Sequence, residues 1–191
     1  MVSSLGLLWR CRSMQRARRR LASWCRDQDG FTAVEFAMVA VPFLMLLFGI
    51  IGVGLFFFTT FALENAVEQS ARLIRTGQVQ ESGMTAAQFK EEVCSRAPAY
   101  VDCSGKLRVN VQSFADFANI QTPNCVDNGG NLVPPAGTAY SPGGSGEVVL
   151  VTVCYEWELA GNIPFLSVGN MANGSALIQA ATTFRTEPYS N

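Results

Sequence analysis

Asp29-Gly30-Phe31-Thr32-Ala33-Val34-Glu35 leads directly into 28 residues without a charged side chain, Phe36 to Leu63. As a helix this uncharged run would be about 42 Å long, which exceeds the roughly 30 Å hydrocarbon core of a bilayer. It is long enough to cross a membrane once, tilted or projecting. A cleavable secretory signal needs only about 7–15 apolar residues and a small-residue cleavage site, whereas this run continues into Glu64-Asn65-Ala66-Val67-Glu68. We therefore interpret the run as an anchor and not as a discarded secretion signal.

The segment up to Gly30 is rich in arginine, with Asp27 and Asp29 as its only acidic residues. Its basic residues are Arg10, Arg12, Arg16, Arg18, Arg19, Arg20 and Arg26. The positive-inside bias then predicts a cytoplasmic N-terminus and an external C-terminal part. After position 63 the chain carries 12 acidic and 7 basic residues, a net charge of −5. Because phosphate binding needs a concentrated basic surface, we expect no nucleic-acid partner and interpret the arginines as topology determinants.

Cysteine is divided unevenly along the chain. Cys11 and Cys25 precede the uncharged run, and four others follow it: Cys94, Cys103, Cys125 and Cys154. Four cysteines in an oxidising compartment can form two bridges in three pairings. The short loop between Cys94 and Cys103 favours that pair, which leaves Cys125 with Cys154; free thiols are the alternative. Zinc fits poorly because the chain has no C-x-x-C pair and no histidine, so we expect no metal and no cofactor.

Two helical patterns follow the run. Leu63, Val67, Ala71 and Ile74 share one stripe, which predicts an amphipathic extension of the anchor that stops near Thr76-Gly77. Thr85-Ala86-Ala87-Gln88 has the form of a capping box that opens a second helix through about Arg96. In that helix Phe89 and Val93 are expected to face inward, and Pro98 to end it.

Three strand patterns come next. Lys106 to Phe114 alternates apolar and polar side chains, and residues 119–146 form a long turn-rich connection with many prolines and glycines. Glu147 to Trp157 is the best strand candidate and is expected to be central, and Ala176 to Thr186 is a third. The sequence thus predicts an α+β fold, in which a long N-terminal transmembrane helix precedes a small antiparallel-sheet head with one additional helix.

Glu35 is the acidic residue at the N-terminal edge of the run. An ionised side chain costs on the order of 2.5–3.5 kcal/mol at the bilayer centre, less near an interface, and calls for a partner. A cut after Gly30 would create an amino group at Phe31, close to Glu35 along the helix, and such charges can pair between neighbouring subunits. Alternatively, Glu35 simply marks the interfacial end of an ordinary anchor.

Gly30-Phe-Thr-Ala-Val-Glu35-Phe-Ala resembles the prepilin-peptidase junction of type IV pilin-like proteins. The wider stretch through Glu64-Asn-Ala-Val-Glu-Gln-Ser-Ala-Arg72 is similar to the TadE-like family of tight-adherence (Flp) pilus systems. Arg72-Leu-Ile-Arg-Thr-Gly77-Gln and Phe184-Arg-Thr-Glu-Pro-Tyr189 also resemble patterns in its longer members, although Thr186 stands where Asn is expected. The resemblance is specific over residues 30–77 and weak elsewhere.

The resemblance implies that Gly30 precedes the scissile bond, that Phe31 becomes the mature N-terminus, and that Glu35 is the acidic residue required at that distance. It implies a pilin-like minor pseudopilin that takes part in Flp pilus assembly, surface adhesion and biofilm formation. The implied partners are prepilin peptidase, other pseudopilins, the Flp pilin, the inner-membrane platform of the pilus apparatus and membrane lipid. The implied location is the bacterial inner membrane, with a single span, a cytoplasmic N-terminus and a periplasmic C-terminal domain, or incorporation in a pilus.

Around the start of the run, Ala33, Ala37 and Ala40 fall on one helical face. They can form a packing seam against sister pilins, since small residues let membrane helices approach closely, or they are ordinary lipid-facing alanines. Pro42 should bend or loosen the helix because it cannot donate to the carbonyl of Met38. Phe56-Phe57-Phe58 with Phe61 forms either an interfacial aromatic cluster or plain hydrophobic filling.

The expected organisation is a basic cytoplasmic leader that is cleaved (1–30), a transmembrane helix (31–63), an amphipathic extension (64–77) and an external α+β head (78–191). An alternative function is an uncleaved single-pass anchor with an envelope-facing binding domain.

We expect no enzyme, because only Glu156 and Glu158 resemble a catalytic pair, on one strand face where solvated surface is the simpler interpretation. Arg185, Glu187 and Tyr189 either dock the tail onto the head or a partner, or are ordinary surface residues.

Overall fold

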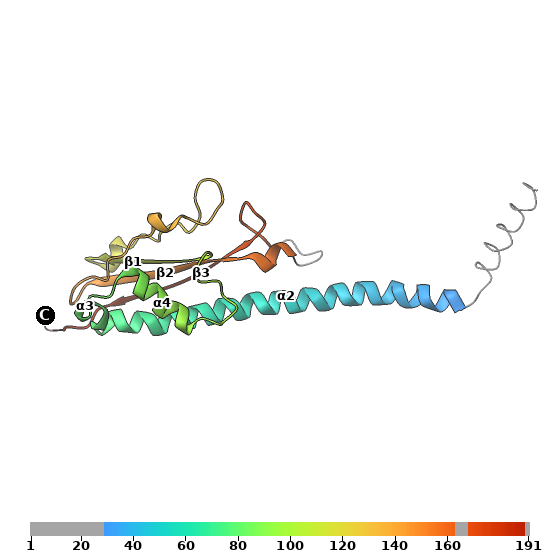
Figure 1. Cartoon of the computed structure of the whole chain (residues 1–191), viewed down its shortest axis with the longest axis horizontal. Helices are drawn as coiled ribbons and strands as arrows, with labels where there is room; N and C mark the ends of the chain where they lie inside the picture. The colour runs from blue at the N-terminus through green and yellow to red at the C-terminus, as the bar shows by residue number, and fades with distance from the viewer. Residues whose placement is uncertain (1–28, 163–167, 190–191) are drawn as a thin grey trace, which may run out of the picture. The chain divides into compact units, whose positions relative to one another are not determined.

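The computed structural model describes residues 29–162 and 168–189 (Figure 1). Its helices are α2 (Asp29–Arg75), α3 (Gln78–Glu81) and α4 (Ala86–Arg96), and its strands are β1 (Leu107–Phe114), β2 (Val148–Trp157) and β3 (Ala176–Arg185). A long apolar N-terminal helix, a short helix and a three-stranded antiparallel sheet confirm the predicted α+β class. The chain divides into two compact units, residues 1–47 and 48–191, and α2 contributes to both.

A glycine conformation and a side-chain cap set the end of α2 and the start of α4. Gly77 has a φ of 82°, a left-handed conformation that glycine adopts readily, and α2 ends just before it as expected. The single turn of α3 comes directly afterwards, a short element that the sequence did not predict. Thr85 caps α4 with the predicted capping box: Thr85 Oγ1 accepts from the Gln88 amide at 3.3 Å, and the Thr85 amide donates to Gln88 Oε1 at 2.8 Å.

The sheet has the order β1-β2-β3, so β2 is the central strand, as predicted. All neighbours are antiparallel, with Val111 opposite Val151 in one pair and Val153 opposite Ala180 in the other. β2 is buried on both faces except at Glu156, because the helices cover one face and the long connection between β1 and β2 is tied to the other. A central strand buried on both sides explains why its sequence is nearly all apolar.

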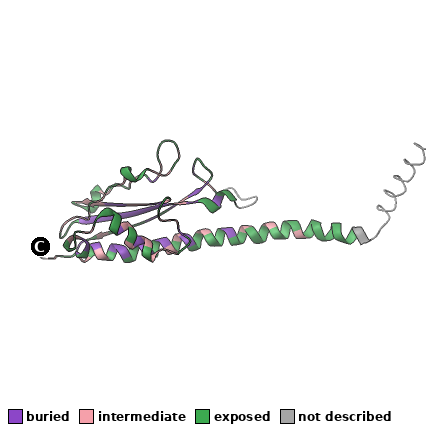
Figure 2. Cartoon of the chain, viewed as in Figure 1, coloured by how far each residue is buried: buried purple, intermediate pink, exposed green. Residues whose placement is uncertain are grey.

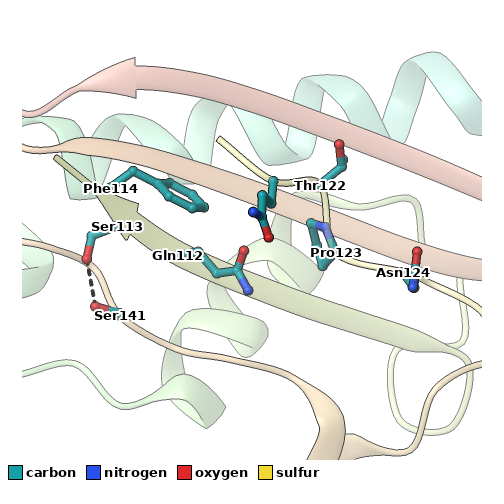
Figure 3. Close-up of a pocket in the computed structure, with 8 residues that line it drawn as sticks. Gln112, Ser113, Phe114, Thr122, Pro123, Asn124 and Ser141 are labelled. Carbon is teal, nitrogen blue, oxygen red and sulfur yellow. Dashed lines mark hydrogen bonds between the residues drawn. The ribbon is translucent and has the colours of Figure 1, made fainter. Parts of the chain in front are cut away.

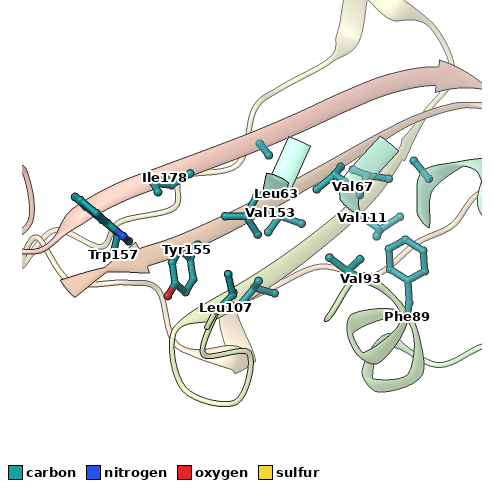
Figure 4. Close-up of a cluster of buried hydrophobic side chains, with 14 of the residues drawn as sticks. Leu63, Val67, Phe89, Val93, Leu107, Val111, Val153, Tyr155, Trp157 and Ile178 are labelled. Carbon is teal, nitrogen blue, oxygen red and sulfur yellow. The ribbon is translucent and has the colours of Figure 1, made fainter. Parts of the chain in front are cut away.

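The core of the second unit lies between the sheet and the helices (Figure 4). The stripe of Leu63, Val67, Ala71 and Ile74 is buried, which confirms the predicted amphipathic face of α2. Phe89 and Val93 of α4 are fully buried beside it, as expected. Figure 2 shows the same face of α2 as buried positions among exposed ones. Each large side chain that becomes fully buried contributes about 1.5–3 kcal/mol, so this stripe fixes the C-terminal half of α2 to the head.

The long connection folds back along the edge of the sheet. The Val111 amide donates to the Ala139 carbonyl at 2.9 Å, and the Ser141 amide donates to the Val111 carbonyl at 2.8 Å. Tyr140 between them donates its hydroxyl to the Met84 carbonyl at 2.8 Å, and burial raises the pKa of this phenol. The connection is therefore attached to β1 and to the turn before α4.

Candidate functional site

The proposed processing junction lies in the first two turns of α2. Gly30 and Phe31 are both helical, and the side chains of Phe31 and Glu35 are exposed. Their role in processing stays a prediction. The arginine-rich leader with Cys11 and Cys25 falls outside the described residues.

The N-terminal part of α2 presents apolar side chains to its surroundings along its whole length. Ala33 and Ala37 are exposed and Ala40 is half-buried, and α2 continues through Pro42, which is also exposed. Since these residues are helical, the spacing of the three alanines does place them on one face. Within the described residues, one helix segment, Phe31–Arg75, is long and apolar enough to cross a membrane, and its most apolar window is almost entirely exposed. That exposure separates it from the buried core helix of a soluble protein.

Farther along α2, the apolar run meets the head sooner than the sequence suggested. The ring of Phe56 packs edge-on against Trp157, with centroids 5.4 Å apart. Thr59 is buried; its hydroxyl lies 2.8 Å from the Leu55 carbonyl and 3.3 Å from the Tyr100 hydroxyl. Phe56 therefore acts as hydrophobic filling. A polar Thr59-Thr60 pair inside the run was the available signal for this contact.

Other aromatic residues of the same helical turns have exposed side chains. Phe57, Phe58 and Phe61 are exposed, and Phe58 lies 6.4 Å from the ring of Tyr100. Beside them, a cavity of about 370 Å³ is lined by residues of α2 and of the head. The lining residues are Leu55, Thr59, Tyr100, Asp102, Lys106, Tyr155, Trp157, Glu158, Leu159 and Asn162.

The charged residues of this cavity neutralise one another in part. Lys106 Nζ lies 2.5 Å from Glu158 Oε2 and 3.9 Å from Asp102 Oδ2. The hydrogen bond from Lys106 to Glu158 raises the pKa of the lysine, and the Ser104 hydroxyl lowers the pKa of Asp102. Burial raises the pKa of Tyr155 nearby. Two carboxylates and one ammonium leave the group with a net charge of about −1 at neutral pH.

Glu156 and Glu158 do not form a carboxylate pair. β2 ends at Trp157, so Glu158 lies in the following 3₁₀ turn, Glu158–Asn162, and the expectation of a shared strand face is wrong. Glu156 accepts from Asn173 and from the Ser175 hydroxyl, whereas Glu158 binds Lys106. Each carboxylate is thus engaged in a separate structural contact.

Both disulfides follow the predicted pairing. Cys94 at the end of α4 is bonded to Cys103, and Cys125 in the long connection is bonded to Cys154 of β2. The first bond ties α4 to the segment that leads into β1. The second holds the long connection against the sheet.

The C-terminal tail docks onto the end of α2. The Glu187 amide donates to the Arg75 carbonyl at 2.8 Å, and Arg75 Nε donates to Glu187 Oε1 at 3.2 Å. The ring of Tyr189 lies against Gly77. Docking onto the head, one of the interpretations of the tail, is therefore confirmed, and Arg185 lies over the ring of Phe117 at 6.0 Å.

Thr186, the departure from the expected Asn, is a buried residue with its own structural role. Its hydroxyl donates to the Gly144 carbonyl at 2.6 Å, and its amide donates to the Glu147 carbonyl at 2.9 Å. It joins the end of β3 to the turn before β2.

A second cavity, of about 500 Å³, opens where β1 ends (Figure 3). Its lining is uncharged and mostly polar: Gln112, Ser113, Phe114, Gln121, Thr122, Pro123, Asn124 and Ser141. The hydroxyls of Ser113 and Ser141 lie 2.9 Å apart across its edge. In the part of the chain that the structure describes, no cluster of three or more His, Cys, Asp or Glu could hold a metal ion.

The comparisons with known proteins agree with the position of the long helix. Residues 30–72 match the sequence model of the TadE-like protein family. The matched segment begins at the predicted junction and ends within the buried stripe of α2. Searches of curated proteins and of solved structures gave no match. Residues 30–72 of this chain are thus a TadE-like family domain.

Proposed function

We propose that the protein is a minor pseudopilin-like subunit that takes part in assembling a tight-adherence (Flp) pilus, and through it in surface adhesion and biofilm formation. The observation that carries this proposal is the match of residues 30–72 to the TadE-like family. The matched segment includes the junction at Gly30-Phe31, the acidic Glu35 and most of α2.

The architecture of α2 suits such a subunit. Its first part is an exposed apolar helix with a small-residue face at Ala33, Ala37 and Ala40, and its last part is buried against a disulfide-braced head. Small residues allow close approach of membrane helices, so this face supplies a packing seam for other pseudopilins or the Flp pilin. Pro42 in the same segment eases local bending, because it cannot donate the helical hydrogen bond.

In this proposal prepilin peptidase removes residues 1–30 at the cytoplasmic face of the inner membrane, and the inner-membrane platform of the pilus apparatus then receives the mature subunit. The head lies in the periplasm or at the pilus. The ammonium group of Phe31 then meets the Glu35 carboxylate of an adjoining copy, which compensates for the cost of an ionised side chain at the membrane edge.

Cleavage is tested by co-expressing the full chain with prepilin peptidase. Gly30→Leu should abolish the shortening of the chain, whereas the same change at Gly49, where no atom lies within 4 Å of an added Cβ, should leave it intact. Glu35→Ala should reduce pilus formation, and Glu64→Ala, an exposed glutamate in the same helix, should not. A parent chain that is not shortened, together with normal pili from Glu35→Ala, would favour the uncleaved anchor with an envelope-facing binding domain.

A further inference from the structure

One end of the head packs on one side of the last part of the apolar run. β2 ends here at Trp157, which packs on Phe56, and the Tyr100 hydroxyl lies 3.3 Å from that of Thr59. The opposite end of the sheet lies beside the C-terminus of α2, where Glu187 binds Arg75. The head therefore has one end at which Trp157 and Tyr100 contact α2 at Phe56 and Thr59.

The part of the run that precedes the first cavity-lining residue matches a bilayer in length. Leu55 is the first residue of α2 that lines the cavity of about 370 Å³ beside Tyr100 and Trp157. From Phe36 to Gly54 there are 19 uncharged residues. A helix of this length is about 28 Å long, close to the roughly 30 Å hydrocarbon core. Glu35 would then stand at one membrane boundary and Leu55 at the other.

Exposed apolar side chains gather at the second boundary. We define the collar as Phe57, Phe58, Phe61, Tyr100 and Leu159, all of them exposed. Phe57 and Phe61 are stacked with centroids 6.4 Å apart, and Tyr100 and Leu159 line the same cavity as Leu55. Aromatic residues are enriched where a helix passes from hydrocarbon into the headgroup region.

We propose that the collar contacts the phospholipid surface directly, so that the head is seated on the membrane around Leu55. This deepens the proposed function and rests on its membrane-spanning helix. The contact is apolar and aromatic. The charged group beside it, Asp102, Lys106 and Glu158, carries a net charge of about −1 and offers no attraction to anionic lipid.

The head supplies a matched pair of positions for the test. Tyr100 and Phe117 are aromatic residues of nearly equal exposure, 51% and 54%, at opposite ends of the sheet. Phe117 lies under Arg185, which is paired with Val148 at the start of β2. Tyr100 lies near Trp157, the last residue of β2. Both positions can accept an indole at the surface without entering the core.

The full chain is reconstituted into phosphatidylcholine vesicles that contain lipid brominated near the top of the acyl chains. The emission added by Tyr100→Trp and by Phe117→Trp is measured against the unsubstituted chain, which removes the signal of the native tryptophans. We expect bromine to quench the indole added at Tyr100 roughly twofold or more, since it lies in the interface. The indole added at Phe117 should be unaffected, and raising the salt concentration should change neither result.

Three results would overturn the proposal. Equal emission of Tyr100→Trp with and without bromine means that the collar does not touch lipid. If that emission also depends on the protein-to-lipid ratio, the collar contacts a second copy of the chain. Quenching at both positions means that the head lies on the membrane without this orientation. Loss of the quenching at high salt concentration would show that the contact is electrostatic.

Extraction at alkaline pH keeps these failures separate from a failure of the proposed function. A chain that stays in the vesicles but shows no quenching at Tyr100 has a membrane span without a lipid-contacting collar. A chain that is released from the vesicles has no membrane span. Non-reducing electrophoresis of both variants verifies that the two disulfides have formed.

Discussion

The ring of Tyr189 lies so close to Gly77 that a Cβ added at residue 77 would stand 2.7 Å from the Tyr189 Cγ and Cδ1 atoms. Gly77 also has a φ of 82°, so two independent constraints select glycine here. The contact joins the end of α2 to the last described residue of the chain, and the bonds between Arg75 and Glu187 lie beside it. The tail is thus part of the structure that holds α2 in the head.

Gly77→Ala should destabilise the protein more than Gly83→Ala does. Both glycines have positive φ values, 82° and 63°, so each alanine costs roughly 1–2 kcal/mol from the backbone alone. Of the two added Cβ atoms, the one at position 77 would meet other atoms within 4 Å and the one at position 83 would not. Thermal unfolding of the full chain in detergent, followed by circular dichroism, should show a larger fall in Tm for Gly77→Ala.

Adding Tyr189→Ala to Gly77→Ala should then recover part of the loss, because the obstructing ring is removed while the strained backbone remains. Equal melting temperatures for Gly77→Ala and Gly83→Ala would show that the tail does not press on α2.

The two disulfides should differ in their contribution to stability. Cys125 and Cys154 are 29 residues apart in sequence, and Cys94 and Cys103 are 9 apart. Loop-closure entropy alone predicts a loss of about 3.5 kcal/mol when the longer loop is opened and about 2.5 kcal/mol for the shorter one. Urea unfolding of the two double-serine variants measures the difference. A smaller loss for the Cys125–Cys154 variant would contradict the view that this bond holds the long connection against the sheet.

Thr152→Val should stabilise the head. Thr152 is fully buried, and its hydroxyl has no hydrogen-bond partner among the described residues. Valine keeps the branched shape and removes an unpaired polar group, which should add about 1 kcal/mol to the free energy of unfolding. Thr182→Val is the control, since the Thr182 hydroxyl donates to Glu68 at 3.4 Å. A loss of stability in Thr152→Val would mean that the hydroxyl is bonded after all.

The acid sensitivity of the head should depend on Ser104. The Ser104 hydroxyl donates to Asp102 Oδ1 at 2.7 Å, and this bond, with the Gly105 amide, holds the pKa of Asp102 below its ordinary value of 3.8. A carboxylate with a lowered pKa stabilises the fold at neutral pH, and the contribution is lost as the pH falls through the folded-state pKa.

Ser104→Ala should therefore raise the pKa of Asp102, so that this loss begins at a higher pH. NMR titration of the carboxyl carbon measures the shift. Ser95→Ala, which removes a hydroxyl bonded only to the Glu92 carbonyl, should leave the Asp102 titration unchanged. A titration of Asp102 that is the same in Ser104→Ala and in the parent chain would contradict the assignment.

Local patterns in the sequence were sufficient to predict most of the fold. The capping box at Thr85 and the glycine at position 77 act through neighbouring backbone groups, so they can be recognised without knowledge of the tertiary structure. The stripe from Leu63 to Ile74 is periodic over enough residues to identify its buried face, and the continuous apolar stretch from Val148 to Trp157 is long enough to identify a buried central strand. The pairing of Cys94 with Cys103 followed from their short separation.

The point along α2 at which contact with the head begins could not be predicted from local sequence patterns. Phe56 packs on Trp157, about a hundred positions away in the chain, and a phenylalanine suits a protein core as well as it suits lipid. Apolar composition alone therefore does not distinguish the exposed part of the run from its head-covered part. The contact of Tyr189 with Gly77 was hidden for a related reason, because both residues have ordinary local explanations and meet only in the folded chain.

N-terminal sequencing of the protein purified from the membranes of cells that carry the pilus apparatus tests the assembly role most directly. The account predicts a first residue of Phe31, with Glu35 at the fifth position of the mature chain. Recovery of a chain that still carries residues from the arginine-rich segment before Phe31 would contradict it.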